Sequence, residues 1–296
     1  MELRLPQTHI YALNPSIDFE SAKQQAFDKR VGVVASGLGG LLARPKPDDV
    51  ELVYDEIRLE SFWHIACIVR YVFDRNQTFS MPITSVEVRS VTLLGQDFDV
   101  AAQQPPQPPS GQPALFQQIS QQMGLSGAAR SFSIPGVEHC VDENRQERYL
   151  DAVNGQALQL GADYTRKDKT EVHDLSELAV GEVLVVPPQL SATRAAKSVL
   201  STMAKQIQAD KILEEITTIE VLDLFFRPIY AFEFAWKLKN KTGVAEFDMV
   251  TGGMTNGKAL HTRGDKPITR EMLFDINADT ATSLMPVAAG NVKLIE

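Results

Sequence analysis

The sequence predicts an α+β fold of two related halves, each an antiparallel sheet backed by helices, with a Pro/Gln-rich insert in the first half. Three observations predict it: alternating apolar segments occur in both halves, helical spacing precedes them, and one aromatic strand pattern occurs twice. Alternation with period two gives a strand one apolar face, and a packed helix is the simplest cover for that face.

Length and composition fit a folded chain. The 296 residues are 44% hydrophobic and 23% charged, which is ordinary for a globular protein and excludes global disorder. No run approaches the ~18–20 apolar residues of a membrane span, and the amino terminus lacks the pattern of a signal peptide. We therefore predict a cytoplasmic protein with no membrane span. A formal net charge of −9 disfavours nucleic acid as a partner.

The first half, residues 1–185, begins with a helix predicted over residues 18–42. Ala22 and Ala26 recur at helical spacing, and Ser16 or Asp18 is placed to cap the first turn. This helix is available to cover a sheet face.

Residues 50–100 are predicted as strands. The segment Trp63–Phe73 is rich in isoleucine, valine and aromatic residues, which favour strands. We expect a turn at Asp74–Gln77 and a returning strand at Thr78–Ile83.

The Pro/Gln-rich insert spans residues 101–130. Its proline-rich part has no apolar periodicity, so we predict an extended, solvated spacer. The alternative is a segment that docks in the aromatic groove of a partner.

The second half, residues 186–296, repeats the arrangement. Ser191 or Thr193 caps a helix predicted over Ala195–Ile207, and residues 216–250 are predicted as strands. The boundary between the two domains is therefore placed after residue 185.

An internal duplication is predicted from two similar strands. The segment Glu60–Phe73 aligns with Arg227–Asn240 and shares its apolar phase. The apolar positions of the second copy are Tyr230, Phe232, Phe234, Trp236 and Leu238. We expect the two copies to pack across a pseudo-twofold axis.

Each half also contains an Asp-x-x-(Asn/Thr)-Gly segment, at Asp151–Gly155 and Asp248–Gly252. In a turn, the aspartate accepts backbone N–H groups and the glycine supplies a positive φ. The alternative is that Asp151 or Asp248 is catalytic. We favour the structural interpretation.

The aromatic strand, a turn and a second strand together resemble the hairpin of PepSY-type domains. The residues that carry the resemblance are Tyr230, Phe232, Phe234, Trp236, Phe247, Asp248, Thr251 and Gly252. The resemblance implies small α+β modules with inhibitory or binding roles, and no catalytic residue. PepSY modules are typically extracytoplasmic, so the missing secretion signal is a departure. The segment Phe225–Phe234 also resembles uncharacterised bacterial proteins.

A zinc site is the main candidate for bound metal. His64, Cys67, His139 and Cys140 form a Cys2His2 set, the usual ligands of structural zinc. On strands, however, His64 and Cys67 point to opposite faces, as do His139 and Cys140. We therefore predict no cofactor and two free thiols rather than a Cys67–Cys140 disulfide, with zinc as the alternative.

The sequence contains no phosphate-binding glycine loop and no nucleophile motif. We predict a non-enzymatic binding or scaffold protein that contacts another protein, and a homo-oligomer with a second copy of itself is the alternative. Phe225, Phe226, Arg227 and Tyr230 are the candidate interface if they are exposed, and burial in the core is the alternative. A metal-dependent (zinc) enzyme centred on the Cys2His2 set is the competing function.

Overall fold

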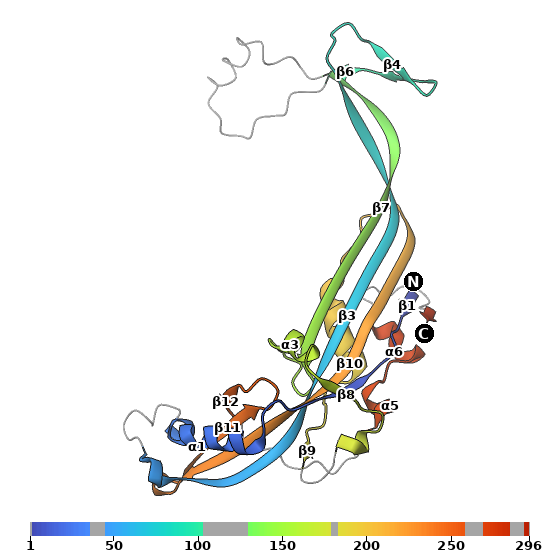
Figure 1. Ribbon diagram of the computed structural model, residues 1–296. Coiled ribbons are helices and arrows are strands. Elements are labelled where there is room, and N and C mark those ends of the chain that lie inside the picture. The colour runs from blue at the N-terminus through green and yellow to red at the C-terminus, as the bar shows by residue number, and fades with distance from the viewer. Residues whose placement is uncertain are drawn as a thin grey trace, which may run out of the picture. The chain divides into compact units, whose positions relative to one another are not determined.

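The computed structural model describes residues 2–35, 45–102, 130–178, 183–257, 269–284 and 293–295 (Figure 1). Strands make up 50% and helices 23% of these residues, and one large mixed sheet contains most of the strands. The predicted α+β fold of two helix-backed halves is therefore wrong. Its strands were expected in two separate sheets, but the long strands of both halves are neighbours in one sheet.

Three long strands dominate this sheet: β3 (Val50–Ile83), β7 (Arg130–Asp151) and β10 (Lys211–Trp236). β3 lies between β10 and β7 and runs antiparallel to both (Figure 1). The turn predicted at Asp74–Gln77 does not form. Instead the Asp210 backbone N–H donates to the Asp74 carbonyl at 3.0 Å, and the Asp210 carboxylate accepts the Asn76 N–H. These bonds hold β3 extended.

Short strands extend the sheet and make it mixed. β1 (Glu2–Arg4) and β2 (Ile10–Leu13) pair parallel with β10, whereas β11 (Lys241–Asp248) pairs antiparallel with it. The remaining strands of the sheet are β6 (Ala101–Ala102) on β7, β8 (Lys169–Glu171) on β2, β9 (Leu184–Val185) on β3, β12 (Met254–Asn256) on β11 and β13 (Lys293–Ile295) on β1. β4 (Ser90–Leu93) and β5 (Gln96–Asp99) form a separate hairpin.

The helices are mostly short. They are α1 (Phe19–Ala35), α3 (Gly161–Thr165), α4 (Ala192–Met203), α5 (Arg270–Leu273) and α6 (Ala278–Leu284), with 3-10 turns η2 (Pro47–Asp49), η3 (Leu175–Leu178) and η4 (Lys237–Lys239). α1 follows Asp18, whose carboxylate accepts the Ser21 N–H at 2.9 Å as expected of a cap. Residues 36–42 of the predicted first helix lie outside the described residues. No described helix is long and apolar enough to cross a membrane.

The chain divides into two compact units that do not follow the predicted boundary after residue 185. Unit 1 comprises residues 1–70, 143–206 and 215–296, and unit 2 comprises residues 71–142 and 207–214. Residues 103–129 of the predicted insert lie outside the described residues.

The main core of unit 1 lies between α1 and the β10–β11 pair. Ala22, Ala26 and Val33 of α1 pack against the aromatic face of β10. Tyr230, Phe232, Phe234 and Trp236 are all buried, as the period-two pattern predicts, whereas Leu238 is 75% exposed because β10 has ended in η4. Gly243 allows the close approach of the helix, since a Cβ there would lie 2.7 Å from the Val33 carbonyl oxygen.

Candidate functional site

The first of the two aspartate turns follows β7. The Asp151 Oδ1 atom accepts the backbone N–H groups of Val153 (2.8 Å) and Asn154 (3.0 Å). The Gly155 N–H donates to the Asp151 carbonyl at 2.8 Å, and Gly155 has a φ of +74°. The turn therefore forms as the residue pattern predicts.

The second aspartate turn follows β11 and has the same bonds. The Asp248 Oδ1 atom accepts the N–H groups of Val250 (2.8 Å) and Thr251 (3.0 Å). The Gly252 N–H donates to the Asp248 carbonyl at 2.8 Å, with a φ of +75°. This turn, too, forms as the sequence predicts.

The backbone bonds around the two turns also correspond. The residue after each aspartate donates to a long strand, from Ala152 N to Ser61 O at 2.9 Å and from Met249 N to Pro228 O at 3.2 Å. The carbonyl of that same residue accepts two successive N–H groups from a segment that leads into a helix. The donors are Gln189 and Leu190 ahead of α4, and Ser16 and Ile17 ahead of α1.

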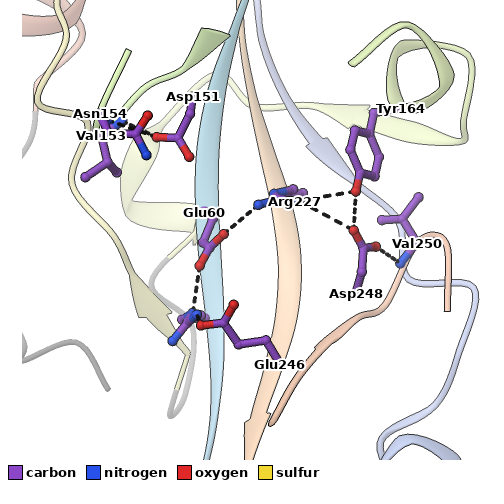
Figure 2. A network of polar contacts seen from close by, with 10 residues as sticks. Glu60, Asp151, Val153, Asn154, Tyr164, Arg227, Glu246, Asp248 and Val250 are labelled. Carbon is purple, nitrogen blue, oxygen red and sulfur yellow. Dashed lines mark hydrogen bonds and ion pairs between the residues drawn. The ribbon is translucent and has the colours of Figure 1, made fainter. Parts of the chain in front are cut away.

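Asp248 differs from Asp151 in what its second carboxylate oxygen contacts (Figure 2). The Tyr164 hydroxyl of α3 donates to Asp248 Oδ2, and Arg227 Nη1 lies 3.6 Å from the same oxygen. Arg227 also donates to the Tyr164 hydroxyl at 3.2 Å and to Glu60 Oε2 at 2.7 Å. One guanidinium therefore joins β10 to β3, to α3 and to the turn after β11.

A second guanidinium extends this network. Arg58 of β3 has only 1% of its side chain exposed, and Nε donates to Glu60 Oε1 at 2.9 Å. Its Nη1 atom lies 3.4 Å from Glu56 Oε1, and Nη2 contacts Glu246 Oε1. Burial opposes the charge, but Glu60 and Glu246 outweigh this and raise the pKa of Arg58. We call these residues the ion network: Glu56, Arg58, Glu60, Tyr164, Arg227, Glu246 and Asp248.

The ion network also changes the acidity of Tyr164. Burial first, and then its hydrogen bond to Asp248, raise the pKa of Tyr164 to about 12. The phenol is therefore protonated at neutral pH. It donates its hydrogen bond to Asp248 Oδ2.

A cavity of about 380 Å³ adjoins the ion network in unit 1. It is lined by Ala157, Leu158, Gln159, Leu160, Tyr164, Arg227, Ile229, Glu246, Asp248, Thr251, Gly253 and Thr255. The lining therefore combines apolar side chains with four members of the ion network, Tyr164, Arg227, Glu246 and Asp248. Its volume lies within the ~300–1,000 Å³ of ordinary small-molecule sites.

His64 and Cys67, two of the predicted zinc ligands, are not brought together. His64 Nε2 lies 2.6 Å from Glu147 Oε1, and its ring stacks on Tyr149 with centroids 4.7 Å apart. Cys67 is completely buried, and burial, followed by the charge of Glu220, raises the pKa of its thiol to about 12. The expectation that these two side chains face apart agrees with this placement.

His139 and Cys140, the other two predicted ligands, lie in unit 2. The His139 side chain is 79% exposed and its Nδ1 atom lies 2.7 Å from Asp74 Oδ1. Cys140 is half-buried, with Sγ 3.8 Å from the Glu138 carbonyl, and both cysteines are free thiols. Among the described residues, no group of three or more His, Cys, Asp or Glu side chains is placed to hold a metal. The zinc alternative stays a prediction, which metal analysis of the purified protein tests.

The four predicted interface residues lie in unit 1. Phe225, Phe226 and Tyr230 are 2%, 0% and 5% exposed, and Arg227 belongs to the ion network. The exposure that the interface hypothesis required is therefore not present in the chain, and the alternative, burial in the core, describes these side chains.

Arg58, Glu246 and Tyr164 belong to the ion network, but the sequence patterns did not single them out as site residues. One signal was available, because Glu56, Arg58 and Glu60 alternate along a strand and so share one face. Glu56 itself is buried, with 8% of the residue exposed. Tyr164 has no comparable signal, since its partners are distant in the sequence.

Unit 2 has a different kind of surface. Its β4–β5 hairpin turns at Leu94 and Gly95, with φ values of +51° and +79°, and the Leu94 side chain is fully exposed. The other exposed large apolar residues of unit 2 are Phe79, Met81, Val86, Leu93, Val137, Val141, Ile212 and Leu213.

Comparison with protein-family models, with curated proteins and with solved structures finds no match, so the resemblance to PepSY modules depends on the residue pattern alone and stays a prediction.

Proposed function

We propose that this chain is a non-enzymatic protein-binding protein and that unit 2 contacts the partner, with Leu94 as an apolar anchor. The observation that carries the proposal is the position of Leu94. A fully exposed leucine occupies a backbone conformation that leucine adopts at a cost.

The turn itself gives no reason for a leucine. A two-residue hairpin turn with positive φ at both positions favours asparagine followed by glycine. A left-handed conformation costs an ordinary L-residue about 1–2 kcal/mol. The exposed side chain of Leu94 recovers none of this cost through burial among the described residues. An apolar side chain at a hairpin tip is suited to insertion into an apolar pocket of another protein.

The remaining surface of unit 2 supports the proposal. Phe79 and Met81 of β3 are 42% and 46% exposed, and Val137 and Val141 of β7 are 46% and 63% exposed. Exposed apolar side chains of this kind are available to a protein partner.

The substitution Leu94→Asn tests the proposal because it suits the turn and removes the anchor. A photoreactive amino acid at position 94 captures the partner in the source cells and so identifies it. The Kd of that partner is then measured for the wild type and for L94N. We expect L94N to keep or raise the thermal stability and to weaken binding by at least about tenfold, as loss of a hot spot does. Leu238→Asn, at a site 75% exposed in unit 1, is the matched control. Absence of a specific adduct at position 94, or equal Kd values for L94N and the wild type, contradicts the proposal.

The corresponding turns support a second proposal, that the chain contains an internal duplication within its single sheet. The β3–β7 pair ends at the Asp151 turn and the β10–β11 pair ends at the Asp248 turn, with the same backbone bonds. Glu60 and Arg227, which align in the sequence repeat, form an ion pair with each other across β3 and β10. A local twofold relation between the two strands accounts for this pairing.

A further inference from the structure

We propose that two copies of this chain associate through the outer edge of β7 in unit 2, as antiparallel strands related by a twofold axis at His139. The part of β7 that belongs to unit 2 is residues 130–142. This association goes beyond the proposed function, because it involves neither Leu94 nor a different protein.

The outer edge of β7 is open in unit 2. β7 is the outermost of the three long strands, so one of its edges faces away from β3 (Figure 1). Among the described residues of unit 2, this edge pairs with β6 at Arg130 and Ser131 and with no other strand. An edge with unpaired N–H and C=O groups is a template for a further strand.

Unit 2 also has few buried side chains to stabilise it. Among its described residues, the buried ones are Tyr71, Phe73, Ser131 and Phe132. Val137 and Val141 of β7 are 46% and 63% exposed. A small sheet needs further strands or a buried apolar face to be stable in water. Pairing at the outer edge of β7 would add strands to this part of the sheet.

Pro135 indicates which residues of β7 direct their backbone groups outward. A proline has no N–H to donate, so within a sheet it is placed where that side of the strand faces solvent. Exposed and partly buried residues alternate without interruption from Ser133 to Val141, as in a regular strand. Every second residue after Pro135, which means Val137, His139 and Val141, therefore also directs its N–H and C=O groups to the outer edge.

An axis at His139 pairs the exposed valines of the two copies. Val137 of each copy lies opposite Val141 of the other, because both are two residues from the axis. Apolar side chains directly opposite each other on one face stabilise a sheet. His139 meets its own copy at the axis, and Asp74 Oδ1, 2.7 Å from its Nδ1 atom, balances the charge of the ring when it is protonated.

The charges of β7 favour this register over its neighbours. With the axis at His139, Glu138 lies opposite Cys140 of the second copy, and Asp142 lies opposite Gly136. An axis at Glu138 would place that carboxylate opposite itself, and an axis at Cys140 would place Glu138 opposite Asp142 twice. Like charges directly opposite each other destabilise a sheet, so both neighbouring registers are disfavoured.

Sedimentation equilibrium of the full chain over a range of concentrations tests the association. We expect monomer and dimer in equilibrium, with a Kd in the micromolar range of small interfaces. Val137→Lys changes both valine pairs of the dimer and should raise this Kd by about tenfold or more. Val86→Lys, at a residue of unit 2 that is 76% exposed and lies outside β7, is the matched control and should leave the Kd unchanged. Thermal melting verifies that both variants fold. A chain that stays monomeric, or equal effects of the two lysines, contradicts the proposal.

Cysteine substitutions test the register. In a Cys140→Ser background, His139→Cys places two thiols opposite each other at the axis, within the Cα separation of roughly 4.4–6.8 Å that a disulfide spans. We expect this variant to form a disulfide-linked dimer under mild oxidation, and Val141→Cys and Val86→Cys to form far less. Crosslinking at position 141 or 86 that equals crosslinking at position 139 contradicts the register.

Leu94→Asn distinguishes this association from partner binding at the hairpin tip. If the dimer forms through β7, L94N should keep the dimer Kd of the wild type. Loss of the dimer in L94N would assign self-association to the hairpin and contradict the proposal. A dimer that forms normally in a chain with no specific adduct at position 94 would support this inference and contradict the proposed function alone.

Discussion

The Asp151 and Asp248 turns share their local hydrogen bonds but have different tertiary surroundings. Each carboxylate accepts two backbone N–H groups through one oxygen, and each turn ends in a glycine with φ near +75°. In the Asp248 turn the second oxygen contacts Tyr164 and Arg227, whereas among the described residues no tyrosine or arginine side chain contacts the Asp151 carboxylate. The same five-residue turn therefore only connects two segments at Asp151, whereas at Asp248 it is also part of the ion network.

We expect the largest loss of stability from a substitution at Arg58, whose side chain is 1% exposed. Arg58→Met removes the buried guanidinium that contacts Glu56, Glu60 and Glu246, and should lower the free energy of unfolding by about 3 kcal/mol, as breaking a buried ion pair does. Urea unfolding measures the change. The control is Arg166→Met, at a side chain 80% exposed, for which the change should stay within about 0.5 kcal/mol. Similar losses in the two variants would mean that the network contributes little stability.

Replacing each aspartate by alanine in separate variants compares how much stability the two turns contribute. Asp151→Ala removes a cap of two N–H groups and should cost about 1 kcal/mol. Asp248→Ala also deprives Tyr164 and Arg227 of an acceptor and should cost about 2–3 kcal/mol. Urea unfolding of both variants is the measurement. Equal costs would contradict the view that only Asp248 has a tertiary role.

Substituting alanine for Gly155 and for Gly252 distinguishes the cost of backbone strain from the cost of a packing clash. Gly155→Ala and Gly252→Ala each place an L-residue at positive φ and should cost about 1 kcal/mol. A Cβ at position 252 would lie 2.6 Å from Ile17 Cδ1, whereas at position 155 the nearest atom is 3.9 Å away, in Leu190. We therefore expect a slightly larger loss for G252A in thermal unfolding, and adding Ile17→Val should remove the excess. An excess that persists with valine would point to another cause.

The pH dependence of Tyr164 is the most selective probe of the Asp248 turn. Because its pKa is raised from 10.0 to about 12, its contribution to stability is present below pH 10 and is lost as the pH rises through 12. The ionisation of Tyr164 is measured as the difference between the ultraviolet pH titration of the wild-type protein and that of the Tyr164→Phe variant. Asp248→Asn should move it to lower pH, and Asp151→Asn should leave it unchanged. A transition near pH 10 in the unmodified protein would contradict the buried hydrogen bond.

The sequence predicted much of the local structure. Alternation identified the buried face of β10, helical spacing identified the start of α1, and the Asp-x-x-x-Gly segments identified both turns. It did not predict the fold class. An alternating strand has two hydrogen-bonding edges, and nothing in its residues states which strand occupies each edge. β3 and β10 were therefore placed in separate sheets although they are neighbours in one.

The candidate site was less predictable than the fold. Arg227 was selected as an interface residue, and its actual partners come from three other segments. Glu56, Arg58 and Glu60 showed a period-two charge pattern, but exposed strands show the same pattern. Only burial distinguishes the two cases, and burial depends on what packs over the strand.

The sequence by itself determined where α1 begins and how each aspartate turn closes, because those bonds join residues at most five positions apart. The tertiary structure alone decided which aspartate became part of a charged site. Tyr164 reaches Asp248 across 84 positions, and Arg58 reaches Glu246 across 188. Such contacts depend on the order of strands in the sheet, and that order results from the packing of the whole chain rather than from any local pattern.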